Sequence, residues 1–317
     1  MRTMANRDRV SEIRDIKQRQ NPRSSVSFHF LVLQHQWRDL QDKNQDVTAF
    51  FPIRAVTLIE VFTKRWITTL IDHGAPYDER AVPLAKNVKL DYETMRALHG
   101  RSITLGDLIS HSTSINNFEQ LMNIFETLMG KDFQQSLKEA VDHFAVEFEG
   151  KPSSPIIVDF QSNAATIAHL FQTRHKLVHE YPRHPAYAVE EVTTMLDAAA
   201  NLTQAIEEVC SKTLHGKIPY TTRDICESIG QEWETINDEL QDVLKRLAES
   251  IDEQGKQLLA DSQDNWQTFQ QAQCEFRADN ARGGTMSGIL YISEKRSLTK
   301  ARLDQMRWYI EREEGQL

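Results

Sequence analysis

The sequence predicts an all-α protein in which a helical bundle is followed by a long helical hairpin domain. Apolar residues recur three or four positions apart over much of the chain, which is the period of a helix that buries one face. Glycine, proline, serine and asparagine interrupt this period between the segments, as they do in turns. With 317 residues, 40% of them hydrophobic, the chain is long enough for two domains with substantial cores.

The amino-terminal segment is highly charged. Residues 1–25 end near the turn signal Asn21-Pro22. We expect a mobile or weakly helical arm that lies outside the core.

Periodic segments predict a bundle over residues 26–212. The first helix begins near Ser27, and the second begins near Pro52, a residue that suits a first helical turn, and ends at Gly74-Ala75-Pro76. Residues 78–99 predict a loop with one short helix. Further helices are expected near 105–109, 118–129, 133–148, 160–178 and 189–209. The apolar stripe expected on the first helix consists of Phe28, Leu31, Val32 and Leu40.

The carboxy-terminal region has a different pattern. After a linker at 213–217, residues 218–317 predict two long helices that form a hairpin and a third antiparallel segment from about 289 to 310. Gly255 is expected to kink or end the first of these helices. Its apolar residues have the spacing of a coiled-coil-like helix: Ile229, Trp233, Ile236, Leu240, Val243, Leu247 and Ile251.

Composition excludes several classes of function. The net charge of −9 disfavours a broad phosphate-binding surface, so we expect no DNA partner and only a local contact with RNA. Three cysteines without CxxC spacing predict neither a zinc site nor a disulfide framework. The sequence shows no signal peptide and no apolar stretch of membrane-spanning length. We therefore expect a cytoplasmic protein that needs no metal or cofactor.

The most informative motif lies near the end of a predicted helix. Arg174 is followed five residues later by His179 and seven residues later by Tyr181. A guanidinium keeps its charge and binds phosphate through two donors, while an imidazole takes and gives a proton near pH 7. An Arg-x4-His pair occurs by chance about once in a chain of this composition, so the tyrosine adds most of the specificity.

The string RHKLVHEY at 174–181 resembles the Arg-x4-6-His signature of HEPN ribonucleases. The resemblance covers residues 26–212 but is specific only at the motif. It implies a homodimeric endoribonuclease, a toxin or anti-phage abortive-infection effector, that cleaves RNA by 2′-hydroxyl attack and leaves a 2′,3′-cyclic phosphate. By this resemblance Arg174 and His179 are catalytic, His175 assists them, and Glu60 is a supporting acidic residue. Tyr181 matches a tyrosine that a partner nucleotidyltransferase antitoxin can AMPylate.

Helix geometry leaves the arrangement of the motif open. Five residues turn a helix through about 140° beyond a whole turn, so Arg174 and His179 do not share a face. The arginine must reach round the helix, the helix must end or bend, or two protomers must combine their motifs. His175 and His179 do share a face, which also fits an ordinary polar helix edge near a carboxy terminus. The supporting role of Glu60 competes likewise with a solvated helix face.

Residues 218–317 resemble a second family, the lysozyme-inhibitor LprI-like module. Glu294 stands where a second cysteine is expected to partner Cys274, so the disulfide usual in that family is not predicted here. The residues that carry the resemblance are Cys226, Ile236-Asn237, Ser262-Gln263-x-x-Trp266, Cys274, Phe276, Gly283-Gly284-Thr285 and Leu298-Thr299-x-x-Arg302.

Two other functions are compatible with the sequence. One is a non-catalytic dimerisation or scaffold protein, in which both helical domains bind partners. The other is a lysozyme inhibitor, which the lack of a signal segment and of the cysteine pair disfavours.

Overall fold

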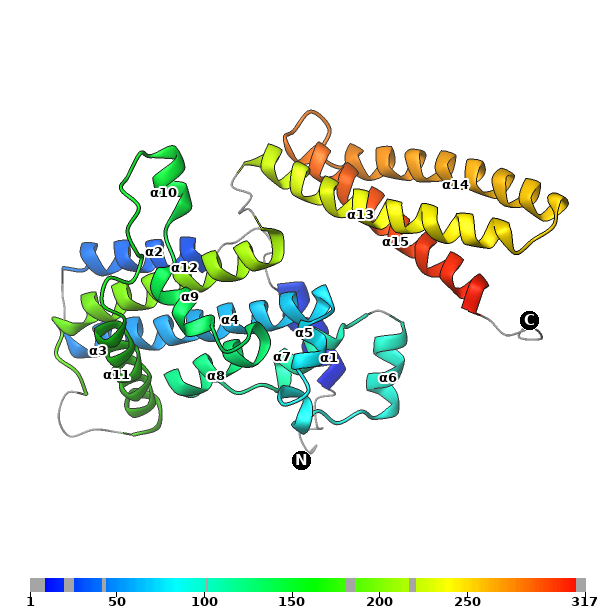
Figure 1. Ribbon diagram of the computed structural model, residues 1–317. Coiled ribbons are helices and arrows are strands. Elements are labelled where there is room, and N and C mark those ends of the chain that lie inside the picture. The colour runs from blue at the N-terminus through cyan, green and yellow to red at the C-terminus, as the bar shows by residue number, and fades with distance from the viewer. Residues whose placement is uncertain are drawn as a thin grey trace. The chain divides into compact units, whose positions relative to one another are not determined.

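The fold is all-α, as predicted. The computed structural model describes residues 9–19, 26–41, 44–100, 102–180, 186–216 and 221–311. Within these ranges no β-strand forms, and the extended residues Val141 and Pro155 pair in an isolated antiparallel bridge. The chain divides into two compact units, Met1–Thr213 and Leu214–Leu317 (Figure 1). Among the described residues, no helix combines the length and the apolar character needed to cross a bilayer.

The first unit is built around α4 (Phe50–His73), which packs against α2 (Val26–Asp39), α7 (Leu105–Ser112) and α11 (Phe160–His179). Its buried residues recur at helical spacing, so the helix is apolar on most of its circumference. Pro52 lies in the first turn, as predicted, and Gly74 ends the helix with a φ of 98°.

Tryptophan side chains of α2 and α4 form hydrogen bonds with α12 (Glu191–His215). The Trp37 Nε1 donates to Thr193 Oγ1 at 2.8 Å, and the Trp66 Nε1 donates to Glu207 Oε2 at 3.1 Å. Both rings are buried, so each hydrogen bond satisfies a donor that would otherwise be costly to remove from water.

Local capping sets several helix bounds. α8 (Phe118–Met129) has the predicted limits and begins where the Asn117 side chain accepts from Gln120 N. The single helix predicted at 133–148 is instead two, α9 (Phe133–Glu139) and α10 (His143–Phe148). The chain is extended at Ala140, and the Asp142 carboxylate caps α10.

The segment predicted as a loop with one short helix is largely helical. It contains α5 (Tyr77–Arg80), the 3₁₀ turn η1 (Leu84–Asn87) and α6 (Tyr92–His99). The Asp91 side chain caps α6 by accepting from Thr94 N. A cap made by a single aspartate is easily missed where the apolar runs are short.

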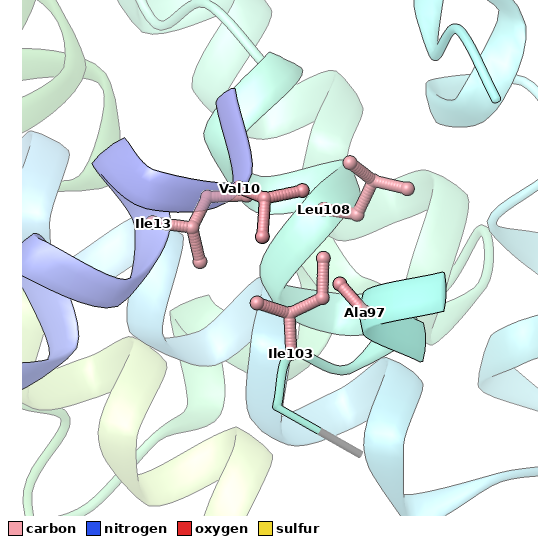
Figure 2. Close-up of a cluster of buried hydrophobic side chains, with 5 residues drawn as sticks. All are labelled: Val10, Ile13, Ala97, Ile103 and Leu108. Atoms are coloured by element: carbon pink, nitrogen blue, oxygen red, sulfur yellow. The ribbon is translucent and has the colours of Figure 1, made fainter. Parts of the chain in front are cut away.

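The prediction that residues 1–25 lie outside the core is wrong for α1 (Arg9–Arg19). Val10 and Ile13 are 3% and 4% exposed and pack with Ala97, Ile103 and Leu108 (Figure 2). Lys17 Nζ also donates to Asp107 Oδ2 at 2.6 Å. Two buried side chains and this ion pair anchor a helix whose composition resembles that of a solvated segment.

The apolar stripe predicted for α2 is also wrong. Phe28 and Leu31 are each 59% exposed, whereas Phe30, Leu33 and Trp37 are buried. Both sets have helical spacing, and the contacts with α4 and α12 decide which one turns inward.

The second unit consists of α13 (Thr222–Glu249), α14 (Glu253–Asp279) and α15 (Met286–Glu311), the three helices predicted. α13 and α14 each pack along α15 around the buried Leu240 and Leu303. α13 ends before Gly255, which lies in the first turn of α14 and donates its backbone N–H to the capping Asp252.

Candidate functional site

The candidate site lies at the carboxy-terminal end of α11. The helix begins at a cap in which Asp159 accepts from Ser162 N, and it buries Ile167, Leu170 and Phe171. It ends at His179, because Glu180 is extended at φ −121° and ψ 157°. Arg174 is half-buried, whereas His175 and His179 are exposed.

Arg174 faces α4, where it meets Glu60. Its Nη2 atom lies 3.8 Å from Glu60 Oε1, and the two side chains are 30% and 29% exposed. Burial raises the pKa of Glu60, while the positive charges of Arg174 and Lys64 oppose that rise. At this distance no hydrogen bond joins the two groups, and the contribution of the pair to stability is small.

His175 and His179 lie together on another side of the helix. Their ring centroids are 5.0 Å apart and the rings are inclined by 47°. The four-residue spacing explains this contact. The structure thus forms two pairs, Arg174 with Glu60 and His175 with His179, and shows no hydrogen bond or ion pair between the described side chains of Arg174 and His179.

A cavity of about 490 Å³ lies beside the motif, between α11 and the start of α8. The sequence did not predict it. The asparagines at 116 and 117 precede a predicted helix in the sequence, but nothing in the pattern signals that they lie near α11. The lining residues are Asn116, Asn117, Phe118, Glu119, Ala168, Phe171, Gln172, His175, Lys176 and Glu180.

Tyr181, the predicted modification site, lies outside the described residues. Within the described ranges, no group of three or more histidine, cysteine, aspartate or glutamate residues is arranged to hold a metal ion.

In the second unit, a polar cluster joins α14 to α15. Arg302 Nε donates to Gln263 Oε1 at 2.7 Å, and its Nη2 donates to Ser262 Oγ at 2.9 Å. The guanidinium carbon of Arg302 also lies 5.8 Å from the ring centroid of Trp266. The strings that carried the LprI resemblance therefore meet in space.

Residues 217–306 match the family model described as lysozyme inhibitor LprI. No curated protein and no solved structure matches the chain. The match lies within the second unit, so the HEPN resemblance of residues 26–212 stays a prediction.

The cysteines of this LprI-like unit are free. Cys274 is buried, and Cys226 is half-buried. Burial and the nearby Glu294 carboxylate raise the pKa of Cys274. A glutamate therefore stands beside Cys274, where the resemblance led us to expect a second cysteine.

Proposed function

We propose that the first unit is an endoribonuclease of the HEPN type. Its substrate is RNA, and Arg174 and His179 are its catalytic residues, assisted by His175. The proposal rests on the resemblance at 174–181 and on the pairing of Arg174 with Glu60.

The reaction proposed is transfer of a phosphodiester to its neighbouring ribose hydroxyl. One histidine takes the proton from the 2′-hydroxyl, whose oxygen attacks the adjacent phosphorus. The bond to the 5′-oxygen breaks, and that oxygen receives a proton from an imidazolium. The products are a 2′,3′-cyclic phosphate and a free 5′-hydroxyl, so DNA, which lacks the nucleophile, is not cleaved.

The guanidinium and the imidazoles have different tasks. Arg174 stabilises the charge that grows on the non-bridging phosphoryl oxygens. Proton transfer by a well-placed histidine contributes roughly 10²- to 10⁴-fold.

The pairing of Arg174 with Glu60 is the observation that carries the proposal. Glu60 belongs to α4, far from the motif in sequence, and its side chain lies 3.8 Å from the guanidinium. An arginine beside a half-buried carboxylate at a helix end, with two exposed imidazoles nearby, provides the charge and the proton carriers that phosphodiester transfer requires.

RNA cleavage by the purified full-length chain tests the proposal. We expect fragments with 2′,3′-cyclic phosphate ends, and a loss of about 100-fold or more for Arg174→Ala and for His179→Ala. Arg307→Ala is a matched control because Arg307 also pairs with a glutamate of another helix. His99→Ala is a second control because His99, like His179, is the exposed last residue of a helix. An intact RNA pool with well-folded wild-type protein would refute the ribonuclease.

The biological role proposed is a cytoplasmic toxin or abortive-infection effector that acts as a homodimer. The free cysteines are compatible with a reducing compartment. Expression should arrest growth, and His179→Ala should relieve the arrest. A scaffold protein would not respond to that substitution.

The LprI match supports a second candidate function, inhibition of a lysozyme by the second unit. We rank it lower because Glu294, rather than a cysteine, lies beside Cys274. A cell-wall lysis assay with purified chain tests it: undiminished lysozyme activity at excess chain rules it out.

A further inference from the structure

The cavity beside α11 borders His175, the histidine proposed to assist Arg174 and His179. His175 lines it, and the same ring lies 5.0 Å from the ring of His179. Its volume of about 490 Å³ falls in the range of roughly 300–1,000 Å³ typical of sites that enclose a small organic group. A group in this cavity would therefore sit next to the phosphate on which the motif acts.

The walls of the cavity offer hydrogen-bonding groups that the described residues do not use. The side-chain amides of Asn116 and Gln172 make no hydrogen bond with any described residue. Each amide has two donor hydrogens and an acceptor oxygen. Phe118 and His175 add ring surfaces. Such a wall suits a flat ligand that carries donors and acceptors on its edge.

The charged residues that line this cavity favour an uncharged base over a phosphate as its ligand. One lysine, Lys176, lines it together with two carboxylates, Glu119 and Glu180. Carboxylates therefore outnumber lysines among the charged residues of the lining. A phosphate would be repelled, whereas an uncharged nucleobase would not. Proteins that read RNA sequence bind splayed-out bases by stacking on rings and hydrogen bonding to base edges.

We propose that this cavity binds one unpaired base of the RNA, next to the scissile phosphate. The inference rests on the proposed ribonuclease function and specifies its substrate as single-stranded or looped RNA. Asn116 and Gln172 contact the edge of the base, and His175 or Phe118 contacts its face.

An abasic scan tests the proposal. The probe is a fluorescent single-stranded oligoribonucleotide in which one abasic nucleotide is moved along the sequence, and binding is measured with full-length His179→Ala protein. At one position the abasic RNA should bind about tenfold more weakly, because a stacked base contributes substantially to affinity. Gln172→Ala and Asn116→Ala, added to His179→Ala, should weaken binding of intact RNA and remove this discrimination.

Gln161→Ala is the matched control. Gln161 is exposed on the same helix and lies eleven residues before Gln172, close to the same face, but it does not line the cavity. The abasic effect should persist in this variant.

Two results would overturn the base site: equal affinity for all abasic RNAs, or discrimination that survives both amide substitutions. Cleavage by wild-type protein is measured separately. Cleavage without an abasic effect removes the base site alone, and an abasic effect without cleavage removes the ribonuclease alone. Absence of any RNA binding contradicts both proposals.

Discussion

At the scale of residues, the candidate site combines positions that the sequence places far apart. Glu60 and Arg174 meet because α4 and α11 pack together, and the half-buried setting raises the pKa of the carboxyl group. His175 and His179 meet because of their spacing on one helix. The motif predicted the second contact, and the HEPN resemblance named Glu60 as the supporting acidic residue, with a solvated helix face as the alternative.

Glu60→Ala should reduce RNA cleavage by about 10- to 100-fold, because a misplaced guanidinium no longer stabilises the transition state. The loss should appear in kcat rather than KM. The free energy of unfolding should change by about 1 kcal/mol or less, as for other partly exposed ion pairs. Glu60→Gln keeps an acceptor oxygen and should recover part of the rate. Unchanged kcat in Glu60→Ala would remove the positioning role.

At the scale of elements, close helix crossings depend on single residues. A Cβ atom on Gly106 would lie 2.7 Å from Thr68 O of α4 and 2.7 Å from Asp72 Oδ1, so α7 approaches α4 closely only because residue 106 is glycine. Gly230 on α13 has open space around its would-be Cβ atom. Glycine is therefore required by close packing at residue 106, whereas at residue 230 there is room for a side chain.

Substitution of these glycines by alanine should change stability in opposite directions. Gly106→Ala should lower the free energy of unfolding by about 1–3 kcal/mol through backbone displacement. Gly230→Ala should raise it by about 0.5–1 kcal/mol, because alanine loses less conformational entropy in a helix. Urea unfolding of the full chain measures both. A stabilising Gly106→Ala would show that α7 moves away from α4 without cost.

At the scale of the whole molecule, charged side chains interact within each unit. The position of the motif also raises the question of whether two protomers together form the candidate site. In the second unit Glu232 lies between His215 and Arg296. The nearby His215 ring, whose Nδ1 lies 3.6 Å from Glu232 Oε1, and the hydrogen bond from Arg296 lower the pKa of Glu232 to about 2 against the opposing effect of burial. In the first unit, Arg174 and His179 lie on different sides of α11, so assembly of two protomers remains a route that joins them.

Acid should weaken the contribution of Glu232. Because its pKa falls from 4.5 to about 2 on folding, the stabilisation is present above pH 4.5 and is lost as the pH falls towards 2. Glu232→Gln should lower the melting temperature at neutral pH, and its curve should converge with that of the wild type near pH 2. Glu227→Gln, at an exposed i,i+4 pair, is the control. Parallel curves for Glu232→Gln and wild type would contradict the shift.

Mixing two inactive variants tests whether the site needs two protomers. Arg174→Ala and His179→Ala chains, co-refolded in equal amounts, should recover about one quarter of wild-type cleavage if each site takes its arginine from one protomer and its histidine from the other. Half of the dimers then contain one chain of each variant. In such a dimer one site has both the arginine and the histidine, and the other site has neither. Sedimentation measures the oligomeric state of each preparation. No recovery from a dimeric mixture would assign both residues to one chain.

Much of the secondary structure was determined by the sequence alone. Helical period, capping residues and helix-ending glycines act over a few residues, which is why α8 has its predicted limits and α4 has Pro52 in its first turn. The short-range strings of the LprI-like unit likewise predicted the family match at 217–306.

Only the tertiary structure decided which faces are buried and which side chains meet. It turned Phe30 rather than Phe28 inward, docked α1 through Val10 and Ile13, paired Glu60 with Arg174 and formed the cavity beside His175. Burial is a property of contacts between segments distant in sequence, and local periodicity fits more than one face equally well. The free energy gained by packing those segments together selects among the faces that the sequence allows.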